Sequence, residues 1–143
     1  MNLYMLLQKY YTFHKRLLLK VVPCSYDNVI EELCDISSSV NIPRSTRFHE
    51  KGIGIVIGNG VSLGENVTIY NNVTLGHRHG GHNGTPTIKD NVVLFCHCAV
   101  LGDVVVGENC IVGAYSLVIN DVPPNCMVVG VPAKIVKDNI SSS

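Results

Sequence analysis

Charge is scarce in this sequence and balanced where it occurs. Charged residues make up only 15% of the 143 residues, and 11 basic side chains against 11 acidic ones leave a formal net charge of zero. A nucleic-acid-binding protein carries a clustered basic excess, so this composition argues against a nucleic-acid partner. Hydrophobic residues reach 46%, and at this length they suffice for one domain with a substantial core.

An apolar run long enough to cross a membrane is also missing from the first twenty residues. Lys9, Lys15, Arg16 and Lys20 interrupt that segment, and it contains no small-residue cleavage site. We therefore expect neither a signal peptide nor a membrane span. The six cysteines show no metal-ligand spacing. Thiols without an export signal indicate a reducing compartment, and we expect a cytoplasmic location.

The sequence is rich in aliphatic residues that recur at every sixth position. The set comprises Ile57, Leu63, Ile69, Leu75, Ile88, Leu94, Val100, Val106, Val112 and Val118. A second row of small or aliphatic residues, which includes Cys98 and Cys110, lies two positions earlier. A period of six fits neither a helix nor a hairpin sheet, and three hexapeptides make one triangular turn. We predict an all-β solenoid, a left-handed parallel β-helix with these rows stacked inside it.

The repeat divides the chain into three parts. Residues 1–42 are predicted to hold a short N-terminal helical segment and a connector, because apolar residues recur at helical spacing before Pro23. The β-helix is expected over 43–122, and a C-terminal turn, strand and tail over 123–143. Leu75 and Ile88 are thirteen positions apart, one more than two repeats. Residues 77–85 are therefore expected to leave the coil as a loop, and such loops often carry function.

Six short segments after residue 53 carry the most specific signal. They are Gly54-Ile-Val-Ile-Gly58, Val73-Thr-Leu-Gly76, Pro86-Thr-Ile88, Ile111-Val-Gly-Ala114, Asp121-Val-Pro-Pro124 and Gly130-Val-Pro-Ala-Lys134. In this order they resemble the hexapeptide-repeat acyltransferases, particularly the serine acetyltransferase branch and its relatives in surface-polysaccharide biosynthesis. The resemblance implies an O-acetyltransferase that forms a homotrimer. It also implies that acetyl-CoA is the co-substrate, that no metal is needed, and that the acetyl group passes directly to a hydroxyl acceptor.

A histidine acts as the general base in that family, a role that suits imidazole because its pKa lies near neutrality. Two histidines match the family's positions. His49 precedes Gly54, as the base of the serine acetyltransferases precedes the same motif, although at a different spacing. His79 lies in the loop after Val73-Thr-Leu-Gly76, where the sugar-acetylating relatives carry their base. His77 and His82 are expected to be surface residues without a chemical role.

The resemblance also implies a set of acetyl-CoA contacts. The residues expected to make them are Gly76, Cys96, Ala114 and Lys134. Gly76 would allow the thioester to approach the backbone closely. The segment 94–98 departs from the family, which has small residues beside the pantetheine arm, whereas this chain has Phe95 and His97. His97 is expected to point outward from the coil, because it lies between Cys96 and the inward Cys98.

Two further departures concern the acceptor. Phe48 stands where serine acetyltransferases have an acidic residue directly before the catalytic histidine. Gly84 and Thr85 replace an Arg-His pair that holds the carboxylate of the amino acid. Without a cation there, a free carboxylate has no obvious partner. We therefore expect a sugar or glycan-precursor hydroxyl as the acceptor, with L-serine as the alternative.

Two remoter alternatives stay open. A solenoid carbonic anhydrase would hold zinc between subunits through three histidines and keep an open water position. The histidines available for such a site are His77, His79, His82 and His97. The neighbours Cys96, His97 and Cys98 cannot chelate one ion together, because adjacent residues of a strand point to opposite faces. The other alternative is a non-catalytic trimeric scaffold.

Overall fold

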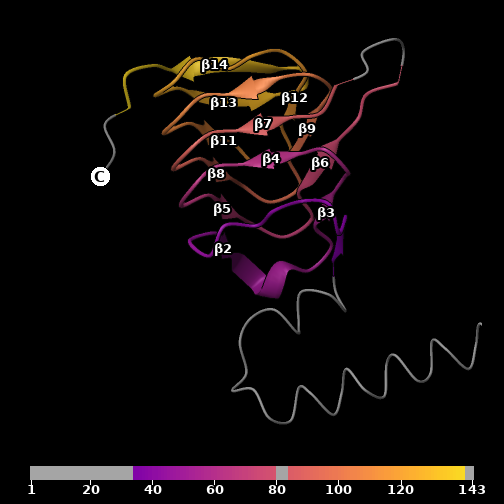
Figure 1. The fold of residues 1–143 in the computed structure, drawn as a ribbon. Helices are drawn as coiled ribbons and strands as arrows, with labels where there is room; N and C mark the ends of the chain where they lie inside the picture. Colours follow the sequence, from indigo (N-terminus) through magenta and orange to yellow (C-terminus); the bar gives the residue numbers. More distant parts are fainter. Residues whose placement is uncertain (1–33, 80–83, 141–143) are drawn as a thin grey trace, which may run out of the picture.

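The computed structural model describes residues 34–79 and 84–140. They form a left-handed parallel β-solenoid of about four turns (Figure 1), which confirms the predicted fold. The N-terminal helix predicted before Pro23 and the side chain of His82 lie outside the described residues. Within those residues, no helix is long and apolar enough to cross a membrane.

Three walls of very short strands make up the solenoid. The first wall contains, in spatial order, β1 (Asp35–Ile36), β3 (Val56–Ile57), β6 (Thr74–Gly76), β9 (Ala99–Leu101) and β12 (Leu117–Val118). The second contains β4 (Ser62–Leu63), β7 (Thr87–Ile88) and β10 (Val105–Val106). The third contains β2 (Arg47–Phe48), β5 (Thr68–Ile69), β8 (Val93–Leu94), β11 (Ile111–Val112), β13 (Met127–Gly130) and the antiparallel β14 (Ala133–Lys137).

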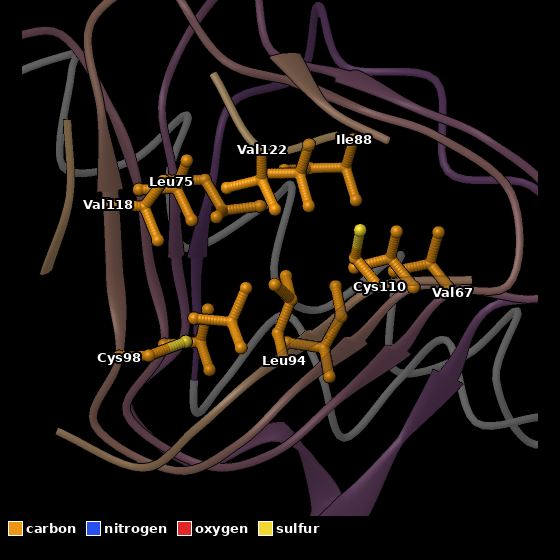
Figure 2. Close-up of a cluster of buried hydrophobic side chains, with 14 of the residues drawn as sticks. Val67, Leu75, Ile88, Leu94, Cys98, Cys110, Val118 and Val122 are labelled. Atoms are coloured by element: carbon orange, nitrogen blue, oxygen red, sulfur yellow. The ribbon is translucent and has the colours of Figure 1, made fainter. Parts of the chain in front are cut away.

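The aliphatic rows found in the sequence form the core. Side chains such as Leu75, Ile88 and Leu94 converge from the three walls (Figure 2) and are 1% exposed or less. Cys98 and Cys110 are buried in the same core, as predicted. Burial raises the pKa of the Cys98 thiol to about 12, and the nearby Cys96 adds to the shift. Cys98 is therefore an uncharged packing residue at neutral pH.

The parallel stack extends beyond both ends of the expected range 43–122. Asp35 and Ile36 pair with Val56 and Ile57, and β13 pairs in parallel with β11. Ile57 lies 21 positions after its partner Ile36, whereas Leu75 lies 18 positions after its partner Ile57. The difference is three residues. Because this insertion shifts the hexapeptide phase, the sequence repeat does not extend to β1 and β2.

The insertion occurs at η1 (His49–Gly52), a short 3-10 turn between β2 and β3. A second insertion is the loop 77–85, which joins β6 to β7. These strands belong to neighbouring walls, so the thirteen positions from Leu75 to Ile88 replace the usual six at one corner. The loop therefore adds seven residues to a single corner. The spacing along the sequence had suggested one extra residue in two repeats.

The alternation along β3 predicts opposite outcomes for two neighbouring truncations. Ile57→Ala removes a side chain that is 1% exposed, and we expect it to lower the free energy of unfolding by about 2–5 kcal/mol. Val56→Ala, at a position 38% exposed, should cost far less. Denaturant titration of both variants measures the difference. Equal losses would contradict the inward and outward assignment of this strand.

Candidate functional site

Most of the expected site residues lie along one corner of the solenoid. We call it the site edge, the corner at which the chain leaves the third wall and enters the first, made of residues 49–55, 70–73, 95–98 and 113–116. His49 lies at the N-terminal end of this edge, and Cys96 and Ala114 lie one and two turns above Asn71. Lys134, in β14, pairs with Val129 above the same edge. Hence three of the expected residues lie on this edge, and the fourth, Lys134, lies in the strand above it.

The other two expected residues lie at a different corner. We call it the loop edge, where the chain passes from the first wall to the second and where the loop 77–85 leaves the coil. Gly76 ends β6 beside this edge, and His77 and His79 follow it as exposed residues. A Cβ atom added to Gly76 would meet no other atom within 4 Å. Within one chain, the first wall separates His79 from His49.

The turn that carries His49 has an unusual backbone. Glu50 and Lys51 have φ values of 50° and 57°, and Gly52 and Gly54 have 72° and 69°. Single residues with positive φ recur at other corners of the solenoid, whereas three follow one another here, and each such conformation is unfavourable for a residue with a side chain. The Cys34 thiol donates a hydrogen bond of 2.8 Å to the carbonyl oxygen of Gly52. Burial raises the pKa of this thiol, so it keeps the proton that it donates.

His49 is the first ring of an aromatic column made of His49, Tyr70 and Phe95. The ring centroids of His49 and Tyr70 are 4.2 Å apart and the rings are within 2° of parallel. The centroids of Tyr70 and Phe95 are 4.9 Å apart with an interplanar angle of 22°. These residues directly follow β2, β5 and β8, which pair in register. Because paired strands lie about 4.8 Å apart, their side chains reach stacking distance.

A second column runs beside the first on the same edge and consists of Asn72, His97 and Tyr115. Asn72 Nδ2 lies 3.4 Å from His97 Nε2, where it can donate a weak hydrogen bond. The ring of His97 is stacked on that of Tyr115, with centroids 4.7 Å apart and planes within 3°. His97 is exposed and points outward, as predicted. Tyr115, at 67% exposure, leaves much of its surface open.

A pocket of about 620 Å³ opens beside His49. The described residues that line it are Arg44, Thr46, Arg47, Phe48, His49, Glu50 and Lys51. Three of them are cationic and only Glu50 is anionic, so an anionic group would be attracted here. Cationic partners for a carboxylate are thus present although positions 84 and 85 carry none. These cations come instead from β2 and its two flanking segments.

Metal ligands do not gather in the part of the chain that the structure describes. No group of three histidine, cysteine, aspartate or glutamate side chains lies close enough there to hold an ion. A zinc site within one chain is therefore not formed by residues 34–79 and 84–140.

The comparisons with known proteins agree with the fold. Residues 85–120 match the family model described as bacterial transferase hexapeptide (six repeats). The serine acetyltransferase of Synechococcus elongatus is 42% identical over 91 residues, which are 62% of this chain and 37% of that protein. The resemblance to serine acetyltransferases is confirmed. The chain thus spans well under half the length of the curated relatives that it matches.

Solved serine acetyltransferase structures superimpose on most of the chain. The Neisseria gonorrhoeae enzyme in complex with serine has a TM-score of 0.67 and 36% identity, covering 73% of this chain and 42% of that one. A serine acetyltransferase in complex with CoA has a TM-score of 0.65 and 33% identity, covering 72% and 41%. At these TM-scores and identities the likeness extends to both the fold and the sequence.

Sequence reasoning missed Tyr70 and the pocket cations Arg44 and Arg47. A signal for Tyr70 was present, because His49, Tyr70 and Phe95 each directly follow an inward residue of the third wall. The three-residue insertion at η1 hid the common register of Phe48 and Ile69, so the column was not visible from spacing alone.

Two glycines should respond differently to alanine. Gly54 has positive φ, and a Cβ there would clash with Asn72 Oδ1. We expect Gly54→Ala to lower the free energy of unfolding by about 1–3 kcal/mol. Gly76→Ala, with open space around the added atom, should leave stability nearly unchanged. Thermal and denaturant unfolding measure both, and an unaffected Gly54→Ala would show that the turn relaxes freely.

Proposed function

We propose that this chain is an acetyl-CoA-dependent O-acetyltransferase with His49 as the general base. The observation that carries the proposal is that His49, Cys96 and Ala114 follow one another along the site edge, with Lys134 in the strand above it. In the proposed arrangement the pantetheine arm runs along this edge past Cys96 and Ala114, and Lys134 interacts with the nucleotide end. The thioester then reaches the pocket beside His49, where the acceptor binds.

In this proposal the reaction is a direct transfer. A hydroxyl group is a weak nucleophile near neutral pH unless a base takes its proton as it attacks. The imidazole of His49 accepts that proton while the oxygen attacks the thioester carbonyl, and a backbone amide stabilises the resulting oxyanion. When the C–S bond breaks, the imidazolium returns the proton to the CoA thiolate. No covalent acetyl-enzyme is formed.

A homotrimer would bring the two edges together. His79 and Gly76 lie on the loop edge of each chain, and His49 lies on the site edge. If the loop edge of one copy faces the site edge of the next, Gly76 can border the thioester bound beside His49. His79 of the neighbouring copy is then the second candidate for the base. The trimer is therefore part of the proposed site.

L-serine is the better supported acceptor. Its support comes from the serine acetyltransferases to which the chain is similar and from the cations beside His49. Arg44, Arg47 and Lys51 offer the carboxylate partner that positions 84 and 85 lack, and arginine suits a planar carboxylate. A sugar hydroxyl is the second candidate, favoured by Gly84 and Thr85. A cytoplasmic location accords with the free thiols of the five described cysteines.

A thiol-release assay with acetyl-CoA distinguishes the two acceptors. We expect turnover with L-serine, and Arg47→Gln should raise the KM for L-serine about tenfold or more while leaving the KM for acetyl-CoA unchanged, because a charge-assisted hydrogen bond contributes about 1.5–3 kcal/mol. Nucleotide sugars are the comparison substrates. Turnover with a nucleotide sugar and none with L-serine would favour the second candidate.

The base is tested by single alanine variants at His49, His79 and His77. His49→Ala should lower kcat by about 10²- to 10⁴-fold with little change in KM, since a general base acts on the transition state. His77→Ala should retain wild-type kinetics. Loss of kcat in His79→Ala together with normal kcat in His49→Ala would assign the base to the loop. Normal kcat in both variants would refute the proposed mechanism.

A further inference from the structure

The proposed base is not directly preceded by the acidic residue that the resemblance to serine acetyltransferases implies; its acidic neighbour, Glu50, follows it in the chain. Phe48 occupies that position, and its side chain packs against the hydrophobic core instead of facing His49. Among the residues that the structure describes, no hydrogen bond holds the His49 ring. The ring nevertheless has a close partner, because one of its faces lies flat on Tyr70 at 4.2 Å.

Tyr70 is itself held in place. Phe95 is stacked behind it at 4.9 Å, and the backbone nitrogen of Tyr70 donates a 2.9 Å hydrogen bond to the carbonyl oxygen of Leu94. The register of β2, β5 and β8 fixes the height of each ring along the solenoid. Tyr70 and Phe95 are both half-buried, whereas His49 is exposed. The half-buried end of the column is therefore formed by Phe95 and Tyr70, and its exposed end is the His49 ring at the pocket.

We propose that Tyr70 is the positioning residue of His49 and stabilises its imidazolium form during acetyl transfer. This inference rests on the proposed role of His49 as the base. Face-to-face contact fixes the plane of the imidazole and leaves its nitrogen atoms, which lie on the ring edge, free to meet the acceptor hydroxyl. Catalytic groups need such positioning to within about 0.5 Å and 10–20°.

The aromatic face also compensates in part for the missing carboxylate. When His49 takes the proton of the acceptor hydroxyl, it becomes a cation, and a cation within about 6 Å of a tyrosine ring is attracted by the ring's negative face. The charged groups lining the pocket beside His49 are Arg44, Arg47, Glu50 and Lys51. Since three of these four are cationic, they oppose a further positive charge. Tyr70 supplies attraction from the ring face without adding a negative charge.

Substitutions at Tyr70 separate this role from a structural one. Tyr70→Leu should lower kcat about 3- to 30-fold, the equivalent of about 0.7–2 kcal/mol, and leave the KM for acetyl-CoA unchanged. Tyr70→Phe keeps the ring and should retain at least half of the wild-type kcat. Phe95→Leu, which removes the support behind Tyr70, should give an intermediate loss of kcat, and the KM for acetyl-CoA reports separately on any contact of Phe95 with the pantetheine arm. Thermal unfolding of each variant checks that the fold is intact.

A spectroscopic measurement tests the stack without relying on activity. In the wild type, the ring current of Tyr70 should shift the carbon-bound ring protons of His49 upfield in proton NMR spectra. Tyr70→Leu should abolish this shift and Tyr70→Phe should preserve it. A wild-type protein without the shift would overturn the proposal, and so would a Tyr70→Leu variant with normal kcat.

The two proposals fail in different ways. If His49→Ala is fully active, the base assignment is wrong and the inference about Tyr70 falls with it, even where the NMR shift is present. If His49→Ala is inactive and Tyr70→Leu is fully active, general-base catalysis by His49 stands and only the positioning role of Tyr70 is refuted. A loss in Tyr70→Phe equal to that in Tyr70→Leu would assign the effect to the hydroxyl group and refute the role of the ring.

Discussion

In-register pairing of parallel strands from turn to turn is the constraint on which the rest of this structure depends. It places Ile57, Leu75 and Val100 directly above one another in the first wall, so the core is a set of aliphatic columns. The same register acts on the outward residues. Whatever follows a strand in one turn meets its counterpart in the next turn at about 4.8 Å. The core and the aromatic column are therefore consequences of one hydrogen-bonding pattern.

The corners of the triangle are where this constraint is relaxed. Strands must keep their register, but a corner can lengthen if the extra residues leave the coil. The chain lengthens two corners, at η1 and at the loop 77–85. The first carries His49 and the second carries His79. The candidate chemistry thus lies at the two places where extra residues do not disturb the core.

The sequence predicted the part of the fold in which the hexapeptide repeat is regular. Inward residues from Ile57 to Leu75 and from Ile88 to Val118 follow from their six-residue spacing on either side of the loop 77–85. Ile36 and Phe48 belong to the same pattern but escaped notice, since η1 shifts the phase by three residues. The cationic pocket and the stacking of Tyr70 on His49 depend on which turns become neighbours in space. Spacing along the chain carries that information only after the insertions have been located.

The antiparallel strand β14 has a consequence for how copies of this chain can meet. A parallel solenoid ends in a row of unpaired backbone groups, and these groups can form hydrogen bonds with the first coil of another molecule. Here β14 folds back on β13 with reversed direction and forms the upper edge of the third wall (Figure 1). A strand of reversed polarity presents the wrong hydrogen-bond spacing for a parallel coil. At this wall, end-to-end growth into a fibre is therefore disfavoured.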